Sequence, residues 1–343
     1  MTQAWTEVRD ASLRSRNTFG VDAIAPLLVE VADAAALPEA LARRADDAPM
    51  LLGGGSNLLF AGNPPGAVIA LATRGIAIIG DDDSAIIRAD AGVVWHDFVL
   101  WSLEHGLCGL ENLALIPGTV GAAPIQNIGA YGVEVREHIH AVEAFDRIGG
   151  TMVRIDNAGC AFAYRDSLFK RDPEHYVVTA VEFALPRTPA LRLDYAGLGE
   201  ELAAMGIADP TPAQVAAAVI RIRRRKLPDP AVLGNAGSFF KNPIVPAGIA
   251  AKLQSTHPHM PLFRGNAGDT RKLSAAWLID QCGWKGHREG DAGVAASHAL
   301  VLVNHGDATG AQLLGLARRI ADSVRERFGV AIEPEPRIVG AHW

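Results

Sequence analysis

The sequence has little of several features that would identify a class of protein at once. Its three cysteines, Cys108, Cys160 and Cys282, lie far apart, which excludes a disulfide framework and is typical of a reducing compartment. No apolar run approaches the roughly 20 residues that span a bilayer. The first residues also lack the basic start and apolar run of a signal peptide. We therefore expect a cytoplasmic protein that does not bind a membrane.

Basic residues are fewer than acidic ones: the chain of 343 residues has 32 lysines and arginines and 38 aspartates and glutamates, which gives a formal net charge of −6. That balance argues against general nucleic-acid binding, so any anion-binding site must be local. The histidine pairs His138/His140 and His257/His259 have no third ligand at metal-site spacing, and we expect no metal. The expected ligands are small molecules, and the expected oligomeric state is a monomer.

Helical and strand periodicities are mixed along the chain, which predicts an α+β fold. Helices are predicted over residues 37–45, 94–105, 212–226, 272–282 and 310–328. Strands are predicted at residues 49–52, 67–71, 76–79, 85–89, 139–146, 151–155, 176–185, 299–304 and within 330–339, with turns at 80–83 and 148–150. The run Leu227-Pro228-Asp229-Pro230 ends the third helix sharply, and we place a domain boundary there.

A first glycine-rich loop follows the predicted strand at 49–52. It consists of Gly53, Gly54, Gly55, Ser56, Asn57 and Leu58. Its backbone N–H groups, hydroxyl and amide are equipment for holding a diphosphate. No Gly-Lys-Ser/Thr follows, so it is not a Walker loop, and Leu58 occupies the place of the third glycine of a dinucleotide fingerprint. A plain tight turn is the alternative interpretation.

A second loop, residues 116–132, is more unusual because it contains four glycines, two prolines and no charge over seventeen residues. It is too apolar for a solvated linker, and its small residues permit close backbone contact with something flat and large. An isoalloxazine ring with its phosphate tail fits that demand. The alternative is a buried structural loop.

The segment from Gly234 to Pro243 places one hydroxyl, that of Ser238, among two glycines, two aromatic rings, a lysine and two amides. Glycines allow close approach of a ligand, and the aromatic rings exclude water. A buried hydroxyl in such a place is a candidate proton donor or nucleophile. An ordinary Gly-Ser turn leading into a strand is the alternative.

These segments resemble one family in their order along the chain. The segments are 53–58, 116–132, the Phe-Ala-Tyr-Arg-Asp-Ser motif at 162–167, 234–243, and Glu-Pro-Glu-Pro-Arg at 333–337. Together they resemble the UDP-N-acetylenolpyruvoylglucosamine reductases, the MurB family, from about Asn17 to Gly340. The resemblance implies the FAD-binding fold of the vanillyl-alcohol-oxidase (PCMH-type) superfamily in two subdomains, at 1–74 and 75–227, and a C-terminal α/β substrate lobe at 228–343.

The resemblance also implies a reaction in peptidoglycan synthesis. NADPH reduces FAD, and the flavin passes a hydride to UDP-N-acetylglucosamine enolpyruvate, which gives UDP-N-acetylmuramate. Neither glycine-rich loop contains histidine or cysteine, so we expect the FAD to be non-covalent. The implied cofactor-binding residues are the six of the first loop together with Ile116, Pro117, Gly118, Val120, Gly121, Ala122, Ile125, Asn127, Gly129 and Arg337.

Hydride addition to this enol ether needs a cation for the charge that develops on the carboxylate, and a proton source for the adjacent carbon. Arg165 matches the family arginine and could bind the carboxylate, the alternative being an ion pair with Asp166 or another acid. Ser238 matches the family proton donor. Glu333 and Glu335 share one face of a strand, so spacing cannot choose between them; the family motif favours Glu335.

Other positions match substrate contacts of the family. They are Tyr131, Tyr195, Lys226, Gly237, Asn242, Lys285 and His298. Tyr195 lies in a segment that resembles the substrate-covering loop of the longer family type. Lys226 ends a basic run, Arg221–Lys226, whose other members we expect on a solvated helix face. His298 stands where some members have glutamine, which leaves its role open.

Two rival functions remain. Another FAD oxidoreductase of the superfamily, such as an alcohol or aldonolactone oxidase, would lack the Gly-Ser-Phe-Phe and Glu-Pro-Glu segments. A non-catalytic flavin or nucleotide-sugar sensor would keep the glycine-rich loops but could lose Arg165, Ser238 or Glu335, and this sequence has all three.

Overall fold

The structure, a computed structural model, describes residues 4–42, 49–81, 84–265 and 267–343. Contacts divide the chain into two compact units. The first comprises Met1–Ala11, Ala25–Gly54 and Pro65–Arg224, and the second comprises Ser12–Ile24, Gly55–Pro64 and Arg225–Trp343. The chain changes unit between Gly54 and Gly55, inside the first glycine-rich loop. The three-part division at 74 and 227 stays a prediction.

The first unit contains a four-stranded sheet of order β1 (Trp5–Ser12), β2 (Ile24–Val31), β5 (Val68–Leu71), β3 (Met50–Leu52). Both β2 and β3 run parallel to β5. Val29, Val31 and Ile69 pack in its core with Leu37 of α1 (Leu37–Ala42). The helix predicted over 37–45 therefore forms at its start, and residues 43–45 lie outside the described residues.

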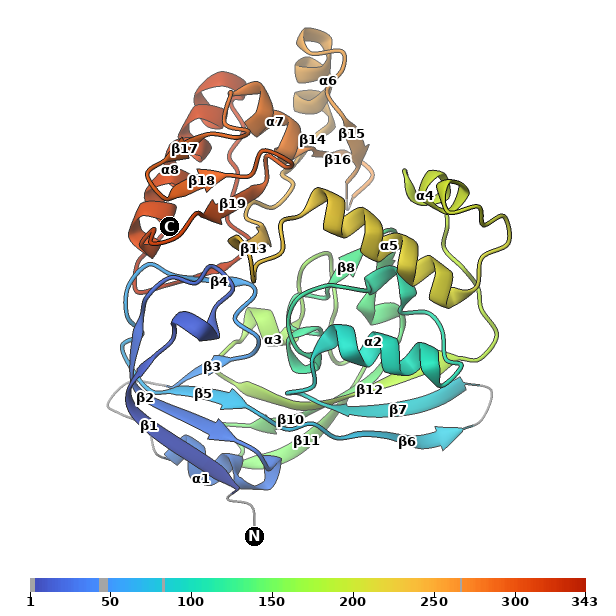
Figure 1. Cartoon of the computed structure of the whole chain (residues 1–343), viewed down its shortest axis with the longest axis vertical. Coiled ribbons are helices and arrows are strands. Elements are labelled where there is room, and N and C mark those ends of the chain that lie inside the picture. Colours follow the sequence, from blue (N-terminus) through green and yellow to red (C-terminus); the bar gives the residue numbers. More distant parts are fainter. Residues whose placement is uncertain (1–3, 43–48, 82–83, 266) are drawn as a thin grey trace. The chain divides into compact units, whose positions relative to one another are not determined.

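A five-stranded antiparallel sheet forms the larger part of the first unit (Figure 1). Its order is β11 (Thr151–Asp156), β10 (Ile139–Asp146), β12 (Tyr176–Pro186), β7 (Ser84–Asp90), β6 (Ile76–Asp81). The predicted hairpin at 148–150 is confirmed, with Asp146 opposite Thr151. Of the predicted turn at 80–83, residues 80 and 81 belong to β6, and residues 82 and 83 lie outside the described residues.

Helices cover one face of this sheet (Figure 1). Phe98 of α2 (Trp95–Glu104) packs on Phe183 of β12 with ring centroids 4.7 Å apart. Helix α5 (Pro212–Lys226) begins after a cap in which Thr211 and Gln214 bond each other's backbone N–H through their side chains. The unit also contains α3 (Leu168–Arg171), α4 (Leu198–Ala204), β8 (Gly129–Ala130) and β9 (Val133–Glu134).

The second unit is built on an antiparallel sheet of order β13 (Gly234–Ser238), β19 (Val301–Asn304), β18 (Ala292–Val294), β17 (Arg288–Glu289). Helices α7 (Ala275–Gln281) and α8 (Gly310–Phe328) pack beside it. Helix α8 begins at a Thr309/Gln312 capping box and ends at Gly329, whose φ is 67°. The prediction over 310–328 is therefore confirmed, whereas residues 272 and 273 of the helix predicted near 272–282 belong to the strand Thr270–Leu273.

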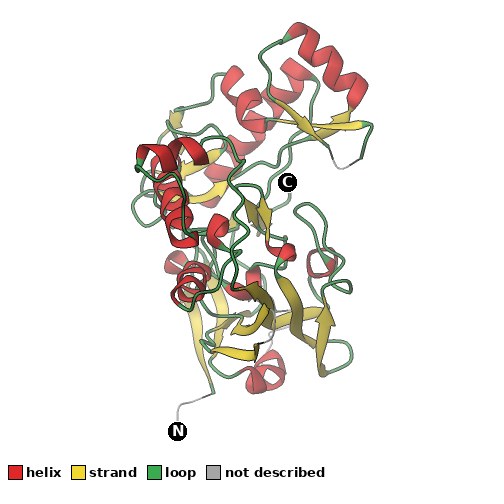
Figure 2. Ribbon diagram, turned by 90° about the vertical axis from the view of Figure 1, so that its right-hand side faces the viewer, coloured by secondary structure: helices red, strands yellow, loops and turns green. Residues whose placement is uncertain are grey.

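Two smaller sheets complete the second unit. Strands β14 (Ile244–Pro246), β16 (Thr270–Leu273) and β15 (Leu262–Arg264) form one with α6 (Ala247–Thr256) against it, near the top of Figure 2. The other pairs β20 (Arg337–Val339) with β4 (Leu58–Phe60) in parallel.

Short 3-10 helices occur in both units and span Arg14–Arg16, Ala34–Ala36, Glu111–Leu113, Val120–Ala122 and Val135–Glu137. Among the described helices, none combines the length and apolarity required to cross a membrane.

Candidate active site

The two glycine-rich loops meet within the first unit. A Cβ added to Gly54 would lie 3.0 Å from Gly118 Cα, and one added to Gly53 would lie 3.1 Å from Thr119 Oγ1. No side chain separates the two backbones at that point, and both Gly53 and Gly54 are exposed. This bare, accessible backbone fits the demand of a bound diphosphate, whose oxygens accept hydrogen bonds from backbone N–H groups.

The second loop is held in shape by a buried amide. Asn127, fully buried and with φ 47°, donates to Glu134 Oε2 (3.1 Å) and to the carbonyl of Ala163 (3.0 Å). Its Oδ1 accepts the backbone N–H of Arg136 at 3.1 Å. The side chain, predicted to bind the cofactor, is thus occupied inside the protein and shapes the loop.

The Tyr-Arg-Asp-Ser motif is attached to the same loop. Arg165 Nη2 donates to the carbonyl of Gly129 at 2.8 Å, and Ser167 Oγ donates to that of Ile125 at 2.6 Å. Asp166, the acid expected to compete for Arg165, pairs with Arg171 instead. Arg165 itself has φ 54°, a left-handed conformation that is uncommon for a residue with a Cβ. The structure therefore fixes this guanidinium beside the loop's carbonyl groups.

Two of the predicted substrate residues, Tyr131 and Tyr195, are in contact. Their rings meet edge to face with centroids 5.1 Å apart, and Tyr195 is 48% exposed. Beneath them Asn112, 1% exposed, donates to the carbonyls of Tyr131 (2.8 Å) and Arg192 (2.9 Å). One buried amide thus joins the second loop to the segment that leads to Tyr195, and its Oδ1 has no hydrogen-bond partner among the described residues.

Most of the basic run at the end of α5 is exposed, as expected, and one of its arginines is not. Arg223 is not on a solvated face, because its Nε donates to the carbonyl of Leu115 (3.2 Å) and its guanidinium lies within hydrogen-bonding reach of the Tyr131 hydroxyl. Burial lowers the pKa of Arg223, and the tyrosine opposes that shift. Arg221 pairs with the buried Glu201 at 2.8 Å. Nothing in the order of residues along this run indicated that Arg223 would be less exposed than the other arginines.

In the second unit, backbone pairing brings Ser238 and Glu335 together. The N–H of Glu335 donates to the carbonyl of Phe239 at 2.8 Å, and Phe240 forms a bridge with Pro334. Ser238 is half-buried, and the two residues that follow it, Phe239 and Phe240, are buried. The serine is therefore next to apolar side chains. The backbone N–H of Arg337 donates to Asn57 at 3.0 Å, which attaches the end of the first glycine-rich loop to the same segment.

The two glutamates of this segment now differ. Glu333 has an exposed side chain, 71% accessible, and its carboxylate lies 3.7 Å from Lys241 Nζ. Glu335 is half-buried and hydrogen-bonded through its backbone next to Ser238. The structure therefore distinguishes two glutamates that spacing alone left equivalent.

Three further predicted substrate residues form a cationic cluster in the second unit. Burial lowers the pKa of His298, and the charges of Lys226 and Lys285 lower it further. Its Nδ1 accepts the backbone N–H of Leu300 at 3.2 Å, so the proton of the neutral ring is on Nε2. A neutral imidazole N–H donor is chemically close to the amide donor of glutamine, which some family members have at this position.

Two further predicted residues, Asn242 and Gly237, have structural surroundings that the sequence did not reveal. Asn242 Oδ1 accepts the N–H of Ala275 at the start of α7, at 3.0 Å. Gly237 has φ 68° at the irregular part of β13, which a residue with a Cβ adopts only under strain.

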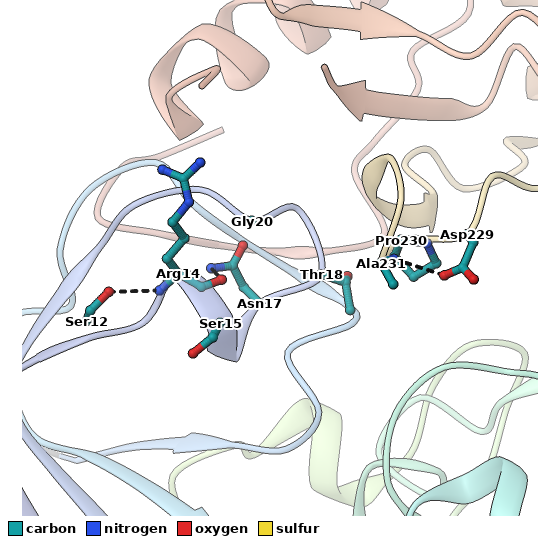
Figure 3. A pocket seen from close by; sticks show the side chains of 9 residues that line it. All are labelled: Ser12, Arg14, Ser15, Asn17, Thr18, Gly20, Asp229, Pro230 and Ala231. Atoms are coloured by element: carbon teal, nitrogen blue, oxygen red, sulfur yellow. Dashed lines mark hydrogen bonds between the residues drawn. The ribbon is translucent and has the colours of Figure 1, made fainter. Parts of the chain in front are cut away.

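A surface cavity of about 670 Å³ also belongs to the second unit (Figure 3). It contains none of the predicted site residues. Arg14 lines it and pairs with Asp22 (3.0 Å) and Asp307 (2.9 Å), and the N–H of Thr18, another lining residue, donates to the carbonyl of Gly55 in the first loop. The lining comprises Ser12, Arg14, Ser15, Asn17, Thr18, Gly20, Asp229, Pro230 and Ala231.

The two glycine-rich loops, which meet in the first unit, are those of an FAD-binding protein according to the family models. Residues 25–156 match the FAD binding domain, and residues 229–339 match the C-terminal domain of UDP-N-acetylenolpyruvoylglucosamine reductase. The chain belongs to the UDP-N-acetylenolpyruvoylglucosamine reductase family, and the fold class expected from the sequence is confirmed.

Relatives of that name match almost the whole chain. The reductase of Xanthomonas euvesicatoria pv. vesicatoria (strain 85-10) is 61% identical over 99% of this chain and 98% of its own length. That of Xanthomonas axonopodis pv. citri (strain 306) is 60% identical with the same coverage. The crystal structure of the reductase (MurB) from Thermus caldophilus is 27% identical, covers 97% of this chain and 98% of that one, and has a TM-score of 0.69.

Proposed function

We propose that this protein is an FAD-dependent enzyme that reduces UDP-N-acetylglucosamine enolpyruvate to UDP-N-acetylmuramate at the expense of NADPH, in peptidoglycan precursor synthesis. Family membership supports the reaction, and one structural observation carries the assignment of roles. That observation is the backbone hydrogen bond from Glu335 to Phe239, which places the segment that carries an acid beside the end of β13, where Ser238 lies.

The residues present fit non-covalent FAD. The exposed backbone at Gly53 and Gly54, packed against Gly118, would hold the diphosphate, and the uncharged second loop would lie along the flavin. When bound there, FAD would supply the hydride chemistry that links NADPH to the enolpyruvyl double bond. Arg337, attached through its backbone to Asn57, contributes a cation to the cofactor.

The chain's own catalytic groups act on charge and on a proton. Arg165 binds the substrate carboxylate through its planar guanidinium and stabilises the negative charge that develops there. Ser238 donates its hydroxyl proton to the adjacent carbon. A serine hydroxyl is a weak acid, so it needs the water-poor surroundings that Phe239 and Phe240 provide. Glu335 orients or protonates the intermediate from the neighbouring segment.

The cationic cluster binds the nucleotide. Lys226 and Lys285 neutralise the diphosphate, and the neutral His298 donates from Nε2. Tyr195 covers the substrate together with Tyr131, while Gly237 and Asn242 contact it from the serine segment. We further propose that the enzyme acts as a cytoplasmic monomer and, through its product, supports cell-wall formation, cell shape and cell division.

The test is an absorbance spectrum followed by anaerobic titration. Purified protein should be yellow, NADPH should bleach the flavin, and the enolpyruvyl nucleotide should restore its colour. Colourless protein that takes up no added FAD would contradict the proposal. Flavin that NADPH bleaches but the nucleotide does not reoxidise would indicate another oxidoreductase of the superfamily, and flavin that NADPH cannot reduce would indicate a sensor.

A further inference from the structure

A histidine outside the predicted site holds the residue that precedes the second glycine-rich loop. The backbone N–H of Leu115 donates to His96 Nδ1 at 3.1 Å, and Ile116 follows directly. Leu115 has φ 59°, a left-handed conformation that residues with a Cβ adopt rarely. Such a conformation persists where the surroundings fix it, so the partners of Leu115 determine how the loop begins.

The other side of Leu115 is fixed from a different helix. Arg223 of α5 donates from Nε to the carbonyl of Leu115 at 3.2 Å. Trp95, the neighbour of His96 in α2, donates its indole N–H to Leu113 (2.9 Å) and its backbone N–H to Gly118 (3.0 Å). The start of α2 and the end of α5 therefore hold the first turn of the loop between them.

This arrangement depends on the charge of one ring. Only a neutral imidazole accepts at Nδ1, because both nitrogens of the imidazolium carry protons. Burial lowers the pKa of His96 below the ordinary 6.5; Asp97 of the same helix opposes the shift, and Arg224 and Arg223 of α5 add to it. The ring is therefore neutral at pH 7. Protonation in acid would place an N–H against the N–H of Leu115.

We infer that His96 is a positioning residue for the cofactor: its neutral imidazole, together with Arg223, fixes Leu115 and hence the second glycine-rich loop, so that acidification weakens FAD binding. The inference rests on the proposed function, in which this loop holds FAD. His96 acts through the backbone of Leu115 and not by contact with the flavin.

The test is a titration of the full-length apoprotein with FAD, followed by flavin fluorescence from about pH 5 to about pH 8, where histidine titrates. For the wild type, the Kd should rise about three- to tenfold towards acid, the effect of losing one hydrogen bond. His96→Asn puts an oxygen acceptor near the place of Nδ1 that cannot titrate, so it should match the wild type at about pH 8 and lose the rise in acid.

Two other variants complete the experiment. His96→Gln carries its acceptor one bond further out and should bind FAD about three- to tenfold more weakly at every pH. His105→Asn is the matched control, since His105 is an exposed histidine at the end of the same helix and should keep the wild-type pH dependence.

Three results would overturn the inference: a wild-type Kd that does not change with pH, an undiminished rise in acid for His96→Asn, or wild-type affinity of His96→Gln. A wild-type protein that binds no FAD at any pH would contradict the proposed function instead, so the two failures are distinguishable.

Discussion

The two units hold their predicted site residues by different means. In the first unit, side chains do the holding: Asn127, Arg165 and Ser167 bond to backbone groups in or beside the second loop. Around Ser238 and Glu335 in the second unit, main-chain bonds do it, because they attach Glu335 and Arg337 to neighbouring segments. Elsewhere in that unit, Asn242 and His298 also accept backbone N–H groups through their side chains. Substitutions in the first group should therefore cost structure as well as ligand binding, whereas the side chains of Ser238 and Glu335 can change with the fold intact.

The strongest test of this contrast is Ser238→Ala. Substrate reduction should fall by about 10²- to 10⁴-fold, the usual contribution of a positioned proton donor. Reduction of the flavin by NADPH and the Tm should stay at wild-type values, because β13 pairs through its backbone. Anaerobic stopped-flow absorbance measures the two half-reactions separately. Equal slowing of both would remove Ser238 from the role of proton donor.

The next largest effect concerns the two glutamates. Glu335→Gln should lower kcat by about 10²-fold or more, whereas Glu333→Gln should change it less than about twofold, because the Glu333 carboxylate is exposed on Lys241. Steady-state NADPH oxidation compares the pair. The reverse order would reassign the acid to Glu333.

Asn127→Ala tests whether side-chain hydrogen bonds hold the second glycine-rich loop in the first unit. It leaves the N–H of Arg136 and the carbonyl of Ala163 without their amide partner, so the free energy of unfolding should fall by about 1–3 kcal/mol. FAD should also dissociate faster. Urea denaturation and flavin release measure the two effects.

The matched control is Asn157→Ala. Asn157 also bonds two carbonyls of the first unit, those of Arg136 and Ile139, but lies outside the second loop. It should lower stability and leave FAD release unchanged. Faster release in both variants would show that general destabilisation, and not the loop, controls the cofactor.

The smallest effect is the pH dependence attached to His298. Its pKa is lowered in the folded protein, so the unfolded chain binds more protons between the folded value and 6.5. Stability should fall as pH decreases through that window and be unaffected above it. The Tm of the wild type minus that of His298→Gln should drop by about 2 °C across the window. A flat difference would show that His298 does not titrate there.

Sequence alone predicted the elements with strong local signals. The helix over 310–328 has a capping box and a terminal glycine, and the hairpin at 148–150 has a Gly-Gly turn, so both were predicted from residues close together in the chain. The helix near 272–282 was partly wrong because residues 272 and 273 belong to the strand Thr270–Leu273, which pairs with both Ile244–Pro246 and Leu262–Arg264. Helix and strand propensities are weak predictors where pairing with another strand determines the secondary structure.

The sequence by itself determined the family, the reaction class and the residue types that carry the chemistry, because ordered motifs are a property of the chain. Only the tertiary structure decided what each side chain is free to do. It engaged the side chains of Asn127 and Asn242 in internal hydrogen bonds, set Arg223 against Leu115 and Tyr131, and gave Glu333 and Glu335 different surroundings. Burial and hydrogen-bond partners depend on residues remote along the chain, and no local pattern encodes them.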